Sequence, residues 1–231
     1  MAVPITNDPK ILGLAFIGGI IPSLFWLWFW LKEEKKKPEP KGLITIVFIM
    51  GMLAVICVLP IQKFIQGSIS LHELQLILLA STEEIIKYLV VIIVLYKTTY
   101  IDEPVEWPIY LITAALGFAA LENTLFLIKP LSLGQNTVSL LTGELRFLGS
   151  TLLHTVSSGI LGIALGISFH LTKFKRRWYL VVGLILAIAL HSVFNFFIIK
   201  NSGNDFLRAF GFLWVVTIIV MLLFEKVRRM N

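Results

Sequence analysis

The sequence is poor in charged residues and has almost no cysteine. Only 15% of the 231 residues are charged and 57% are hydrophobic, whereas soluble domains carry about 25% charged residues. A water-soluble fold with a mean hydropathy of +0.88 would lack the polar residues needed to cover its surface. The single cysteine, Cys57, excludes a disulfide framework and a cysteine-based metal site. The chain also lacks internal repeats and low-complexity regions.

The hydrophobic residues form seven long runs. A membrane-spanning helix needs about 20 mostly apolar residues, and the runs are close to this length. They cover residues 11–31, 43–60, 73–96, 108–128, 147–170, 178–199 and 205–225. We therefore expect an all-α, polytopic membrane protein of about seven transmembrane helices, in which residues 1–231 form one domain. The second and seventh runs are predominantly apolar and are expected to be scaffold.

The basic residues indicate how the chain is oriented in the cell membrane. Of the 20 Lys and Arg residues, 13 lie in segments that follow the first, third, fifth and seventh runs, and six lie on the opposite side. Basic residues concentrate in cytoplasmic loops. The N-terminus is therefore predicted outside and the C-terminus in the cytoplasm. Membrane orientation also accounts for the net charge of +6, and nothing indicates a nucleic-acid partner.

The third run carries three ionisable residues, Glu83, Glu84 and Lys87, near its middle. Each such group at the centre of a spanning helix costs on the order of 2.5–3.5 kcal/mol on insertion scales. From three or four residues away, Lys87 can neutralise one carboxylate on the helix surface. A buried ion pair that fixes helix packing is the structural alternative. The second carboxylate has no compensating charge on its own helix, however, and this favours a functional site.

Three later runs each carry polar residues that packing alone could explain. These are Glu122, His154, and His191 with Asn195 on the same helix face. At 1.5 Å per residue, Glu83, Glu122, His154 and His191 lie roughly 15, 9, 10 and 12 Å below the outer ends of their runs, which places them in one layer. Two histidines and a carboxylate can form a zinc site that leaves one position open for water. A further carboxylate nearby can act as general base.

The ordered set of motifs resembles that of one known family. The motifs are Glu83-Glu84-x-x-Lys87, Phe118-x-x-x-Glu122-Asn123, His154 before a glycine-rich stretch, and His191-x-x-x-Asn195. Over roughly residues 75–200 they are similar to the PrsW family of intramembrane proteases, which belongs to the same broad group as the CAAX prenyl proteases and bacterial Abi proteins. The resemblance implies hydrolysis of peptide bonds in or near the membrane. Some family members are implicated in first-site cleavage of membrane-bound anti-sigma factors.

Two motifs depart from the CAAX protease pattern. That pattern has Glu-Glu-x-x-x-Arg and Phe-x-x-x-His, whereas here Lys87 stands one position earlier and Glu122 replaces the histidine. These departures argue against prenylated CAAX peptides as substrates. We expect instead a membrane-embedded endopeptidase, a zinc metalloprotease, that cuts a membrane-anchored protein within the lipid bilayer near its outer face. The predicted ligands of Zn²⁺ are Glu122, His154 and His191, and the catalytic helices lie within roughly residues 73–199.

The remaining polar residues are predicted to act around the metal. Glu83 would be the general base for the attacking water, with Glu84 orienting it or sharing that role. Lys87 would neutralise the pair. Asn195, one turn from His191, would orient that histidine or donate a hydrogen bond to the oxyanion.

Two other functions are compatible with polar groups inside a membrane. A proton- or ion-coupled transporter also uses intramembrane carboxylates and histidines, but the chain shows no inverted repeat and no pair of broken helices. A non-catalytic relative that only binds peptides would not need the complete set of motif residues. The protease therefore remains the leading interpretation.

The charge distribution generates a test of orientation. A reporter fused after Asn231 is expected to read as cytoplasmic, and a reporter inserted at Leu133-Gly134-Gln135 is expected to read as external. Paired alkaline phosphatase and fluorescent protein fusions measure both positions. The reverse pattern would overturn the orientation and with it the outer-face placement of the polar layer.

Overall fold

A computed structural model describes residues 7–33, 39–96, 98, 100–135, 149–200 and 206–230. Seven helices lie within these residues and confirm the expected all-α fold. They are α1 (Pro9–Glu33), α2 (Lys41–Ser68), α3 (His72–Val94), α4 (Glu106–Ser132), α6 (Thr151–Ile167), α7 (Lys173–Lys200) and α8 (Phe206–Arg228). Residues 147–148 and 205, at the starts of two predicted runs, lie outside the described residues.

Five of these helices, α1, α2, α4, α7 and α8, are long and apolar enough to cross a membrane, consistent with a polytopic membrane protein. The two that fall outside this group carry predicted site residues. Helix α3 is long enough but has Glu83, Glu84 and Lys87 at its middle. Helix α6 has only 17 residues, or about 26 Å, which is slightly less than the hydrocarbon core of a bilayer.

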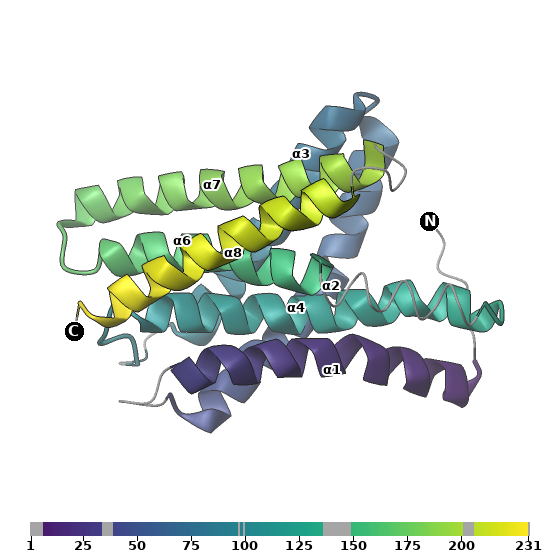
Figure 1. Cartoon of the computed structure of the whole chain (residues 1–231), viewed down its shortest axis with the longest axis horizontal. Helices are drawn as coiled ribbons and strands as arrows, with labels where there is room; N and C mark the ends of the chain where they lie inside the picture. The colour runs from purple at the N-terminus through teal and green to yellow at the C-terminus, as the bar shows by residue number, and fades with distance from the viewer. Residues whose placement is uncertain are drawn as a thin grey trace.

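Helix α4 is the central element of the bundle. In its most apolar window 78% of the residues are buried, compared with 28–39% in the other four candidate spans. It contacts α1, α2, α3 and α6, and Figure 1 shows α1, α4, α6 and α7 side by side along the long axis of the molecule. Because protein surrounds α4, polar groups packed against it are shielded from lipid, which is the condition for retaining them in a membrane.

The backbones of α2 and α4 approach each other closely at two glycines. A Cβ atom at Gly51 would lie 2.2 Å from the carbonyl oxygen of Ala114, and one at Gly117 would lie 2.0 Å from that of Phe48. Small residues at helix interfaces permit such close contact. The two glycines therefore hold α2 against the helix that carries Glu122.

We expect Gly117→Ala to destabilise the protein by about 1–3 kcal/mol, because the added methyl group meets backbone that cannot move aside. Gly67→Ala on α2 is the matched control, since nothing lies within 4 Å of its added Cβ. Thermal unfolding of both variants in the same detergent measures the difference. Equal midpoints would show that the α2–α4 contact is looser than described.

Candidate active site

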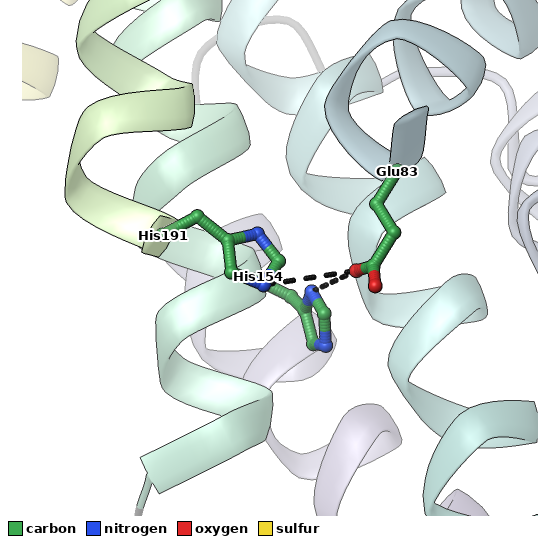
Figure 2. Close-up of side chains that lie close together, drawn as sticks. All are labelled: Glu83, His154 and His191. Carbon is green, nitrogen blue, oxygen red and sulfur yellow. Dashed lines mark ion pairs between the residues drawn. The ribbon is translucent and has the colours of Figure 1, made fainter. Parts of the chain in front are cut away.

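Three of the predicted polar residues meet in the interior of the bundle. Glu83 of α3, His154 of α6 and His191 of α7 each place one potential ligand atom within 4.8 Å of the other two. All three side chains are buried, and Figure 2 shows them converging from separate helices. The convergence agrees with the common depth predicted for these residues.

Lys87 distinguishes between the two adjacent carboxylates. Its Nζ lies 2.8 Å from Oε1 of Glu84 but 3.8 Å from Oε2 of Glu83. The ammonium is fully buried and also lies 4.6 Å from the centre of the Phe118 ring. Lys87 therefore pairs directly with Glu84 and only at longer range with Glu83.

Glu84 holds the ring of His191. Its Oε1 lies 2.9 Å from Nδ1 of His191, and its Oε2 accepts a hydrogen bond from the Ser158 hydroxyl at 2.8 Å. Since a carboxylate accepts, the hydrogen of the His191 ring is assigned to Nδ1. The Nε2 lone pair of His191 is then free, and this atom lies 3.7 Å from Oε2 of Glu83.

His154 is held in a corresponding way by Glu122. Lys87 Nζ lies 2.8 Å from Nδ1 of His154, and Oε2 of Glu122 lies 3.1 Å from its Nε2. An ammonium can only donate, so Nδ1 accepts and the Nε2–H donates to Glu122. Each histidine thus has one nitrogen held by a carboxylate and the other turned toward Glu83. Carboxylates commonly support metal-binding histidines in this manner.

The donor atoms around Glu83 fit a metal ion. Among the described residues, Oε2 of Glu83 is a buried atom with no hydrogen-bond partner. It lies 3.8 Å from Nδ1 of His154 and 3.7 Å from Nε2 of His191. Ligands of a tetrahedral zinc ion lie about 3.3 Å apart, and two histidines with one carboxylate form a known catalytic set. An ion at this point requires Lys87 to release Nδ1 of His154 and to keep its contact with Glu84.

The structure groups the predicted ligands differently from the sequence. Glu122 touches His154 through Nε2, on the far side of the ring from Glu83. The two nitrogens of an imidazole point apart, so a single ion at Nδ1 of His154 is close to Glu83 and not to Glu122. Asn195 is half-buried, and no hydrogen bond between described residues joins it to His191. Glu84 holds that ring instead.

Two residues of the site were missed by the sequence reasoning. Gln62 donates from Nε2 to Oε1 of Glu83 at 2.8 Å. The second hydrophobic run was expected to end at residue 60 and to serve only as scaffold, but α2 continues through Pro60 to Ser68. Ser158 follows His154 by four residues and therefore shares its helix face, a spacing that could have identified it.

We expect Gln62→Leu to lower the free energy of unfolding by about 1–3 kcal/mol, because a buried oxygen of Glu83 loses its donor. Gln66→Leu, one turn further along α2 and exposed, should change stability by at most about 0.5 kcal/mol. Thermal unfolding in detergent compares the two variants. Equal stability of both would show that Gln62 does not hold Glu83.

Comparisons with known proteins identify the family of this chain. The model of the family described as "PrsW family intramembrane metalloprotease" matches residues 39–224. The protein named Protease PrsW from Geobacillus kaustophilus is 29% identical over 191 residues, covering 80% of this chain and 79% of its own.

Similarity extends to two further proteins with the same name. Protease PrsW of Oceanobacillus iheyensis is 29% identical, covering 87% of this chain and 91% of its own, and that of Bacillus subtilis is 26% identical, covering 85% and 88%. No solved structure matches the chain. The family match spans most of the sequence and includes all the residues that converge on Glu83, and the chain therefore belongs to the PrsW family of intramembrane metalloproteases.

Proposed function

We propose that this protein is a zinc-dependent endopeptidase that cuts membrane-anchored proteins within or next to the bilayer. The observation that carries the proposal is the free oxygen of Glu83. It is buried, has no hydrogen-bond partner among the described residues, and faces a nitrogen of each histidine. Burying such an oxygen is costly unless it binds a cation or takes part in proton transfer.

The geometry supports Glu83, His154 and His191 as the residues that would hold the metal. A bound zinc ion would supply a Lewis acid and lower the pKa of water for attack on a peptide bond. In this assignment Glu84 positions His191 and Glu122 positions His154. Gln62 holds the other oxygen of Glu83.

Lys87 has two tasks in this arrangement. Its ammonium compensates the charge of Glu84 at 2.8 Å, and it lies close enough to His154 and Glu83 to face the reacting groups. A positively charged donor at a buried site can stabilise the oxyanion that develops when a peptide carbonyl is attacked. The burial of Lys87 excludes bulk water, which strengthens that interaction.

The roles predicted from the sequence differ from this assignment in the carboxylate that binds the metal. There Glu122 binds the metal with the two histidines, and Glu83 accepts the proton of the attacking water. The free oxygen of Glu83 suits that role as well. Both assignments place Glu83 at the centre, and they differ in whether Glu83 or Glu122 is the carboxylate that touches the ion.

Counting the metal in variants separates the two assignments. If Glu83 is a ligand, Glu83→Gln should lose the ion and the activity, as should His154→Ala and His191→Ala. Glu122→Gln should keep an ion that is bound about 10–100-fold more weakly. The sequence-based roles predict the reverse, namely that Glu83→Gln keeps the ion and loses about 10²–10⁴-fold in rate.

Each variant would be purified in detergent, and its metal would be measured by inductively coupled plasma mass spectrometry. Glu73→Gln, an exposed carboxylate at the start of α3, is the matched control and should retain both metal and activity. If the wild-type protein carries no ion and chelators leave cleavage unchanged, a mechanism based on Glu and His alone must replace the metal.

For the substrate we propose a single-pass membrane protein, with first-site cleavage of an anti-sigma factor as the leading case. The family relation supports this class of substrate, as does the position of the site inside a bundle of membrane helices. The predicted orientation places the cut near the outer face of the membrane. Co-expression with such a substrate, followed by mass spectrometry of the products, locates the cut. The wider kinship with CAAX prenyl proteases and Abi proteins remains a prediction from the motifs.

A further inference from the structure

A cavity of about 280 Å³ lies away from Glu83, where α6 ends and α7 begins. Three basic side chains line it, those of Lys173, Arg176 and Arg177. Arg176 precedes His191 by fifteen residues of α7, or about 22 Å. The cavity is therefore separate from the candidate active site.

The charge of this cavity is not compensated. Its lining includes no carboxylate, and none of the ion pairs between described residues involves Lys173, Arg176 or Arg177. The half-buried guanidinium of Arg176 is stacked 5.2 Å from the ring centre of Trp107 and 5.7 Å from that of Phe169. Stacking presents the planar N–H donors of arginine in a fixed orientation, which suits the oxygens of a phosphate.

Trp107 gives the cavity an aromatic wall that supports Arg176. This residue lines the cavity and is only 6% exposed. The guanidinium of Arg176 lies over the face of its ring. The indole Nε1 is itself buried, so Trp107 acts through the ring face and not as a donor to the cavity.

The surroundings of the cavity resemble a membrane interface. Phe174, Trp178 and Tyr179 project from the same turns of α7 with 70%, 58% and 38% exposure. Exposed aromatic residues gather at the depth of lipid headgroups. Leu165 and Leu180 add apolar wall to the cavity, so that it combines a cationic rim with surface suited to the start of an acyl chain.

We propose that this cavity binds the phosphate of an anionic lipid headgroup, with Arg176, held over the Trp107 ring, as the main contact. Lys173 and Arg177 would hold the negative charge at the rim. The cavity lies at the end of α7 that the positive-inside pattern assigns to the cytoplasmic leaflet, where anionic lipids attract basic residues. This binding site does not depend on the protease assignment.

Binding to the full-length protein tests the proposal. Short-chain phosphatidylglycerol would be titrated onto detergent-purified protein and its affinity measured by native mass spectrometry. Arg176→Gln is expected to weaken binding about tenfold, because it removes a charged donor. Lys175→Gln is the matched control, since it removes one charge from the same turn but does not line the cavity. This control should change the affinity by less than about twofold.

If Arg176→Gln does not fold, Lys173→Gln and Arg177→Gln, both at exposed positions, take its place. Equal losses of affinity in the cavity variants and in Lys175→Gln would show that binding depends only on the total positive charge of this region. That result would overturn the proposal. Unchanged affinity in all variants would also overturn it.

Three further ligands identify the source of the anion. Phosphatidylcholine of the same chain length should bind at least about tenfold more weakly than phosphatidylglycerol, because its headgroup has no net charge. Inorganic phosphate that binds as tightly as phosphatidylglycerol, and with the same dependence on Arg176, would assign the cavity to a soluble anion instead of a lipid. A glutamate-rich peptide that competes in the same way would assign it to an acidic protein segment.

Discussion

The pairing of the buried Lys87 with Glu84 is the interaction on which the interior of this protein depends. Helix α3 carries two carboxylates and one ammonium at its middle, and all three side chains are buried. Charged groups remain in such a position only when partners compensate them. Lys87 compensates Glu84, Glu84 holds His191, and Glu83 is left with one free oxygen directed at both histidines.

The surrounding fold supplies what α3 cannot provide by itself. Helix α4 is shielded by its neighbours and brings Glu122 to the outer nitrogen of His154. Helix α2 packs closely on α4 at Gly51 and Gly117, and its extension past Pro60 brings Gln62 to Glu83. Helix α2, which was expected to be scaffold, therefore helps to build the site, because Gln62 supplies the hydrogen bond that holds Oε1 of Glu83.

The two ends of α7 combine different kinds of chemistry on one helix. Nearer its C-terminal end His191 faces a buried cluster, where a low dielectric strengthens every interaction. Near its N-terminal end Lys173, Arg176 and Arg177 surround an uncompensated cavity beside exposed aromatic residues. A membrane enzyme must sit at a fixed depth and rotation for its site to meet a substrate. Contacts with lipid headgroups at one end of a helix can set the position of residues at the other.

The sequence by itself determined the seven helices, the shared depth of the polar residues and the family. These follow from hydrophobic length and from the order of motifs, which are properties local to each segment. The tertiary structure decided which side chain each of these polar residues contacts. Lys87 is within helical reach of both Glu83 and Glu84, and only the position of His154 and His191 on other helices selects Glu84. Glu122 lies across the His154 ring, and Gln62 joins from α2, because helix rotation and packing are set by contacts distant in the chain.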